Sequence, residues 1–153
     1  DLLIHLAGDI ESVVGFGDTR FIKMQSENIA VASLKFKNGC LGTIEATTAT
    51  SPKDYEGALT IMGSKGIIKI GGFASNKIIY FDNLSNTNLN LSKFSNNLTN
   101  VYGEGHKKFY RYISLFIDKK IKANSFNITS SLKSVKVVEK IVLSFDTKKV
   151  EKI

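Results

Sequence analysis

Alternating apolar and polar side chains predict a series of short β-strands between residues 10 and 82. In "NIAVASLKFKNG", residues 28–39, one side of the predicted strand carries Ala30, Ala32, Leu34 and Phe36. The closing Lys-Asn-Gly is a strong hairpin signal. Five further strands are predicted at 10–17, 40–50, 55–63, 66–72 and 76–82. Six strands with tight turns and no helices between them favour a largely antiparallel sheet.

Apolar residues recur at helical spacing in two later segments, which predicts two helices. The first covers 105–120, and its stripe is Phe109, Tyr112, Ile113, Phe116 and Ile117. The second covers 128–149, and its predicted core face is Leu132, Val135, Val138, Ile141, Val142 and Phe145. Residues 83–100 are rich in Asn and Ser, which is typical of a surface loop.

The opening "DLLIHLAGD" is typical of the end of a helix, with Leu2, Leu3 and Leu6 on its apolar face and Gly8 as its stop. We expect a helix that begins at residue 1 without a cap to be part of a longer protein. The order of elements predicts one α+β domain over 1–153. The predicted domain consists of a predominantly antiparallel open β-sheet of about six strands, with helices on one face of the sheet. The other face is left uncovered and partly apolar, so we expect a homo-oligomer.

Composition narrows the possible partners. The chain has 153 residues, 42% hydrophobic and 23% charged, and a formal net charge of +7. The positive charge favours an anionic partner. The lysines are scattered, so a solvated surface is favoured over a nucleic-acid stripe, and we expect no nucleic acid. No apolar run approaches the ~18–20 residues of a membrane span, and we expect no membrane partner. Cys40 stands alone and no Cys/His cluster suggests a metal, so the cytoplasm is the simplest compartment.

The segment "NVYGEGHKKFY", residues 100–110, carries His106, one of only two histidines, at a glycine-flanked helix start. One explanation is a polar residue near a helix cap. The other is a substrate-facing site. Free N–H groups at a helix start suit an anion, and Gly103 and Gly105 let a ligand approach the backbone closely. The residues alone leave both explanations open.

Four segments in this order resemble the C-terminal domain of the Gfo/Idh/MocA family, the NAD(P)-dependent sugar and cyclitol oxidoreductases. They are "DLLIHLAGDIESVVGF", "ASLKFKNGCLGTIEATT", "LTIMGSKGIIKIGG" and "SSLKSVKVVEKIVLSFDTKK". The second contains the spaced positions Phe36, Gly39, Gly42 and Ile44. The resemblance covers nearly the whole chain and implies the substrate-binding and oligomerisation domain of a two-domain enzyme.

Two stretches, "ATTATSPKDYEGALTIMGSKG" and "VYGEGHKKFY", are similar to enzymes that oxidise C3 of UDP-activated N-acetyl sugars or their uronates. The similarity implies an anionic nucleotide-sugar substrate held by Tyr102, Gly103, Gly105 and His106. Lys53 and Tyr55 are further candidates, for a diphosphate and for stacking, although a solvated loop is the slightly favoured explanation. Asp1 is implied to orient the family's catalytic histidine.

Several family motifs are missing. The dinucleotide-binding Gly-x-Gly-x-x-Gly turn is absent, because "GFGDTR" at 15–20 lacks the third glycine and opens no helix. The Glu-Lys-Pro motif is absent, since the only proline is Pro52. The family's histidine falls three positions before Asp1, and His5 is interpreted as structural. We therefore expect no catalytic residue, cofactor site or metal here, and NAD or NADP on a missing N-terminal Rossmann domain.

Two functional hypotheses follow. The first is the substrate-binding and assembly domain of an NAD(P)-dependent sugar or nucleotide-sugar dehydrogenase, with the isolated chain inactive. The alternative is a stand-alone, non-catalytic binding or oligomerisation module.

Overall fold

The computed structural model describes residues 1–21, 23–53, 55–98, 103–121 and 128–153. The chain divides into two compact units, and each is described by itself. Unit 1 is Asp1–Thr50 with Ala123–Ile153, and unit 2 is Ser51–Lys122. The α+β class with antiparallel sheets is confirmed. The strands belong to two sheets, of four and three strands, where one sheet of about six was expected. The single domain over 1–153 stays a prediction.

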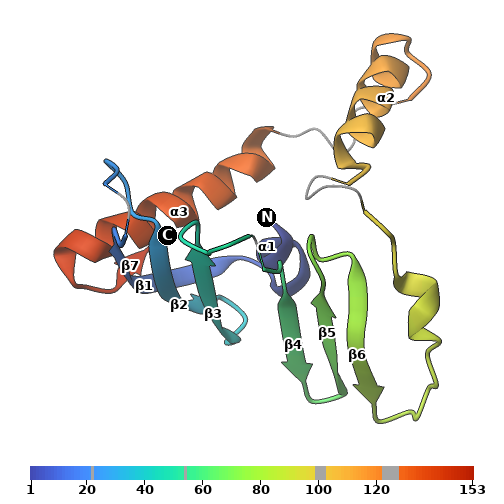
Figure 1. Ribbon diagram of the computed structural model, residues 1–153, viewed down its shortest axis with the longest axis horizontal. Helices are drawn as coiled ribbons and strands as arrows, with labels where there is room; N and C mark the ends of the chain where they lie inside the picture. The colour runs from blue at the N-terminus through green and yellow to red at the C-terminus, as the bar shows by residue number, and fades with distance from the viewer. Residues whose placement is uncertain (22, 54, 99–102, 122–127) are drawn as a thin grey trace. The chain divides into compact units, whose positions relative to one another are not determined.

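Unit 1 is a four-stranded antiparallel sheet with two helices (Figure 1). The strand order is β3-β2-β1-β7. The elements are α1 (Leu2–Ala7), β1 (Ile10–Asp18), β2 (Ile29–Phe36), β3 (Leu41–Thr47), α3 (Ile128–Thr147) and β7 (Glu151–Lys152). The first three strands follow the predicted bounds closely. The two-residue β7, which pairs with β1 at Ser12 and Val13, was not predicted.

The core of unit 1 lies between the sheet and α3, which runs across β1 (Figure 1). The predicted alternation in β2 is confirmed, since Ala32, Leu34 and Phe36 are buried. They pack with a cluster of buried residues from β1 and α3, namely Ile10, Val13, Val137, Ile141 and Phe145. One apolar face of α3 thus covers one face of the sheet.

The buried face of α3 differs from the predicted one. Val137, Ile141, Ser144 and Phe145 point into the core. Four members of the predicted stripe remain exposed, namely Leu132, Val135, Val138 and Val142. The helix is apolar around much of its circumference, so periodicity could not select the face that meets the sheet. The selection is made by contacts with β1, where Gly15 N donates a hydrogen bond of 2.9 Å to Ser144 Oγ.

The predicted apolar face of α1 is also corrected. Leu3, Ile4 and Ala7 pack against the core, while Leu2 and Leu6 are nearly half exposed. The stop at Gly8 is confirmed, with φ of 90° and its N–H donated to Ile4 O. A helix of six residues buries only one narrow face, and the positions of its three leucines did not predict which face that is.

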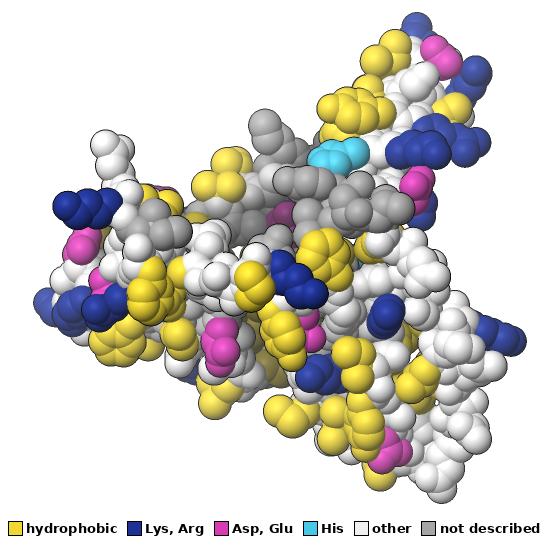
Figure 2. Space-filling model, in the orientation of Figure 1, with side chains coloured by type: hydrophobic (Ala, Val, Ile, Leu, Met, Phe, Trp, Pro, Cys, Tyr) yellow, Lys and Arg dark blue, Asp and Glu magenta, His cyan; other side chains and the backbone are white. Residues whose placement is uncertain are grey.

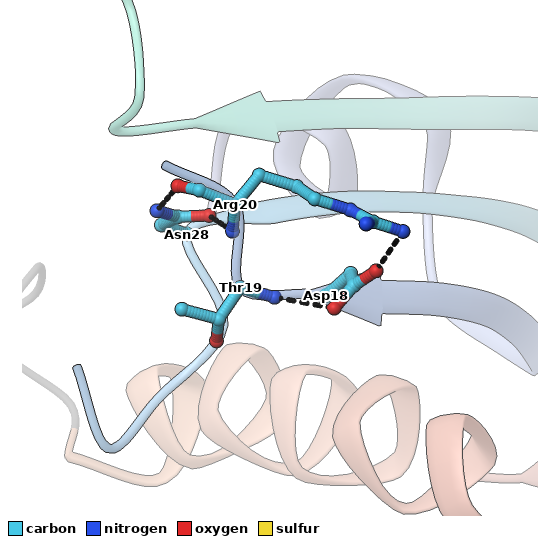
Figure 3. A network of polar contacts seen from close by, with 4 residues as sticks. All are labelled: Asp18, Thr19, Arg20 and Asn28. Carbon is cyan, nitrogen blue, oxygen red and sulfur yellow. Dashed lines mark hydrogen bonds and ion pairs between the residues drawn. The ribbon is translucent and has the colours of Figure 1, made fainter. Parts of the chain in front are cut away.

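The loop between β1 and β2 is closed by a polar network (Figure 3). The Asn28 side chain, only 3% exposed, accepts from Arg20 N at 2.8 Å and donates to Arg20 O at 2.6 Å. Arg20 also forms an ion pair with Asp18, whose carboxylate accepts from Thr19 N. Both ends of the loop are therefore fixed, and the oxygen and the nitrogen of the buried amide each have a partner.

Unit 2 contains a three-stranded antiparallel sheet in the order β4-β5-β6, followed by two helical segments. The elements are β4 (Leu59–Gly63), β5 (Gly66–Gly71), β6 (Lys77–Asn83), the short 3₁₀ helix η1 (Leu91–Phe94) and α2 (Gly105–Ile117). The predicted strands and helix are confirmed. One face of the sheet is apolar, because Ile61, Ile68 and Phe81 stand opposite one another in register.

Candidate functional site

Of the two glycines in the predicted turn before α2, Gly103 and Gly105, only the first has a backbone conformation that favours glycine. Gly103 has φ of 53°, in the left-handed region that favours glycine. A Cβ at residue 103 would also stand 3.1 Å from Leu98 Cδ2. Gly105 is the first residue of α2, and a Cβ there would meet nothing within 4 Å among the described residues beyond its own helix and chain neighbours. As far as the described residues go, the space beside Gly105 is open on the side where a Cβ would point.

His106 is the second residue of α2 and is exposed. The N-cap is Glu104, which makes no side-chain capping bond to the described residues. Glu104 instead accepts from Lys108 N through its carbonyl and lies 3.5 Å from Lys107 Nζ through its carboxylate. Glu104 therefore occupies the N-cap position and His106 lies two residues after it, so both explanations of His106 stay open.

Two other predicted site residues, Lys53 and Tyr55, lie in the segment before β4. Both are exposed, and Tyr55 is 82% exposed. They belong to unit 2, as do Gly103, Gly105 and His106. Tyr102 lies outside the described residues. Unit 2 thus carries the predicted substrate-binding set, contributed by two segments that are distant in the sequence.

The surface around the start of α2 is basic. Lys107, Lys108 and Arg111 are exposed on the helix that begins at Gly105. Figure 2 shows basic and hydrophobic side chains gathered on opposite sides of α2. A positive helix face next to the positive end of the helix dipole suits an anionic ligand. Phe109 and Tyr110 add an edge-to-face aromatic pair, with ring centroids 5.7 Å apart.

Asp1, the predicted orienting residue, lies in unit 1 and precedes α1. It occupies the N-cap position, but its side chain makes no capping bond. Its carboxylate oxygen accepts a hydrogen bond from Ser134 Oγ of α3. No sequence pattern indicates this partner, because 133 positions separate the two residues.

A shallow, open hollow of about 360 Å³ lies at the β4–β5 hairpin. Ile61, Ile68 and Phe81 line it together with residues of the hairpin turn. None of the predicted site residues takes part. Its polar lining residues are Ser64, Lys65, Asp82 and Asn83.

No group of three or more His, Cys, Asp or Glu side chains that could hold a metal ion occurs in the part of the chain that the structure describes. Among the helices of that same part, none has the length and apolar character to cross a membrane.

One family model matches the N-terminal part of the chain. Residues 1–69 match the family model described as the GFO/IDH/MocA C-terminal domain. This agrees with the resemblance found in the sequence. Curated proteins give no match to the chain.

Solved structures match the whole chain. The WlbA dehydrogenase from Bordetella pertussis, in complex with NADH and UDP-GlcNAcA, is 26% identical with a TM-score of 0.87, and the match covers 99% of this chain and 44% of that one. WlbA from Chromobacterium violaceum, with the same two ligands, is 24% identical with a TM-score of 0.81, covering 99% and 42%. A levoglucosan dehydrogenase with NADH and levoglucosan is 15% identical with a TM-score of 0.74, covering 100% and 47%.

The last two are too distant in sequence to show more than the fold. The chain spans less than half the length of each of these dehydrogenases.

Proposed function

We propose, on the premise that residues 1–69 belong to the GFO/IDH/MocA C-terminal domain family, that this chain is the substrate-binding and assembly domain of an NAD(P)-dependent nucleotide-sugar dehydrogenase. In the complete, cytoplasmic enzyme the substrate is a UDP-N-acetylhexosamine or its uronate, oxidised at C3. One observation carries the proposal. The 26% identity to the Bordetella pertussis enzyme extends over 99% of this chain, and that enzyme is in complex with NADH and UDP-GlcNAcA.

The turn at the start of α2 is proposed to bind the substrate. The left-handed conformation of Gly103 shapes it, and the open space at Gly105 admits a ligand. His106 is exposed and can donate to a sugar hydroxyl or an anionic oxygen. Tyr102, Lys53 and Tyr55 complete the proposed set, with Lys53 at the diphosphate and Tyr55 stacking on the base or sugar. The basic side chains of α2 support an anionic substrate.

Catalysis and cofactor binding are assigned to the rest of the complete enzyme. NAD or NADP is bound by an N-terminal Rossmann domain, and the catalytic histidine precedes Asp1. Asp1 orients that histidine from the start of α1. This division is supported by the family motifs missing from the sequence.

The outer face of the four-stranded sheet is proposed as a contact between copies of the enzyme. This is the face opposite α3, and its exposed apolar residues are Phe16, Val31 and Leu41. Phe16 is 71% exposed and stands opposite Val31 in register. Apolar side chains exposed together on a sheet face are typical of an interaction surface.

Calorimetry tests the proposal against the alternative of a stand-alone module. The complete protein is titrated with NAD⁺, NADP⁺ and UDP-GlcNAcA, and the isolated chain is titrated in parallel. We expect the complete protein to bind a dinucleotide and the sugar nucleotide, and the isolated chain to bind no dinucleotide at micromolar concentration. Micromolar dinucleotide binding by the isolated chain contradicts the division of roles. A complete protein that oxidises no sugar nucleotide contradicts the function.

A further inference from the structure

Helix α1 is held in place by polar bonds from other elements in addition to partial packing. It has six residues, and none of its side chains is buried. A helix this short has little stability of its own. Leu3, Ile4 and Ala7 contribute partial packing against the core. The position of the helix therefore depends strongly on what holds its two ends.

The N-terminal end is held by α3. An Asp at an N-cap normally accepts from a backbone N–H of its own helix. The Asp1 side chain makes no such bond, and instead accepts from Ser134 Oγ. A carboxylate suited to capping α1 is thus used to connect α1 to another helix.

The C-terminal end is held by three further bonds. Asn38 Nδ2, in the turn after β2, donates to Ala7 O at 2.8 Å. Lys133 Nζ donates to Asp9 Oδ1 at 2.7 Å, and Lys37 N donates to Asp9 O at 2.9 Å. Two neighbouring residues of α3, Lys133 and Ser134, therefore hold the two ends of segment 1–9.

We infer that Ser134 is a positioning residue for the dehydrogenase reaction, acting through Asp1. This rests on the proposed function, under which a reacting group of the complete enzyme precedes Asp1. The Ser134–Asp1 bond fixes where the chain enters α1, and so fixes the direction of the residues just before it. Displacing a reacting group by about 1 Å can cost on the order of 100-fold in rate.

The test is steady-state kinetics of the complete enzyme with UDP-GlcNAcA and NAD⁺. Ser134→Ala removes the hydroxyl, and Ser134→Thr keeps one. Ser131→Ala is the matched control, because Ser131 is exposed on the same helix one turn earlier. We expect Ser134→Ala to lower kcat about ten-fold or more, with the KM of the sugar nucleotide nearly unchanged. The pH profile of kcat should shift, and Ser134→Thr should restore most of the loss.

An unchanged kcat and pH profile in Ser134→Ala overturns the inference. So does a fall in Tm with normal kcat per folded molecule, which marks a purely structural bond. If Ser134→Ala does not fold, Asp1→Ala tests the same bond, since it removes the acceptor of the Ser134 hydroxyl and leaves α3 unchanged. A wild-type enzyme without dehydrogenase activity overturns the proposed function itself. If the wild type is active and Ser134→Ala leaves its kcat and pH profile unchanged, only this inference is overturned.

Discussion

Gly17 of β1 lies directly against the ring of Phe145 on α3. A Cβ at residue 17 would stand 2.3 Å from Phe145 Cε2, closer than real Cβ contacts come. At Gly15 a Cβ would stand 2.7 Å from the carbonyl oxygen of Val31. The two glycines of "GFG" are therefore packing residues that let α3 approach the sheet. This gives a structural reason for a pair of glycines that does not fit a dinucleotide-binding turn.

Replacing Gly17 by Ala should destabilise unit 1 by about 1–3 kcal/mol, because overpacking forces the surrounding side chains to shift. Phe145 is only 6% exposed and has little room to move. The free energy of unfolding in urea measures the effect. Gly105→Ala is the control, since its Cβ meets nothing within 4 Å. Equal stability of the two variants would show that the α3–β1 contact is looser than described.

Ser144→Ala should destabilise the protein by about 1–3 kcal/mol, because Gly15 N loses the acceptor that it reaches at 2.9 Å. Ser144 is fully buried, so water cannot replace the hydroxyl easily. Thermal unfolding compares this variant with the exposed Ser131→Ala on the same helix. A Tm equal to that of the control would mean that the Gly15 N–H finds another partner.

The Asp9–Lys133 pair should make stability depend on pH. The hydrogen bond from Lys133, and then its charge, lower the pKa of Asp9. A carboxylate whose pKa is lowered in the folded state stabilises the fold above its unfolded pKa. That contribution is lost as the pH falls below about 4. The Tm advantage of wild type over Asp9→Asn should shrink between pH 7 and pH 3. A constant difference over this range would contradict the pairing.

Replacing His106 by Ala in the complete enzyme should lower kcat/KM for the sugar nucleotide. The expected loss of transition-state stabilisation is about 1–3 kcal/mol. One hydrogen bond to the substrate is lost, while the KM of the dinucleotide moves little. Folding should be unaffected, because Glu104 and not His106 is the N-cap of α2. His5→Ala, at the other, exposed histidine, is the control. A raised KM for the dinucleotide with an unchanged KM for the sugar nucleotide would contradict the proposal that this turn binds the substrate.

Phe16→Ser should weaken the proposed contact between copies, since it removes the most exposed aromatic of the outer sheet face. Light scattering against protein concentration should show the wild type as an oligomer and the variant shifted toward monomer. Leu84→Ser is a comparable change at an exposed position outside the sheets. A wild type that stays monomeric at high concentration would contradict the contact.

The sequence by itself determined the first six strands, because alternation in a half-buried strand is a strong local signal. Ala32, Leu34 and Phe36 were predicted on one face and are buried there. The family resemblance, which several motifs carried, is supported by the match of residues 1–69.

Tertiary structure alone decided which face of α3 is buried. Its apolar residues cover more than one face, and the choice depends on Ser144 and Phe145 meeting the glycines of β1. The same holds for Asp1, whose partner Ser134 lies 133 positions away. Periodicity describes each segment separately. A hydrogen bond or a close glycine contact between two distant segments leaves no pattern in either of them, and it forms only when the chain brings them together.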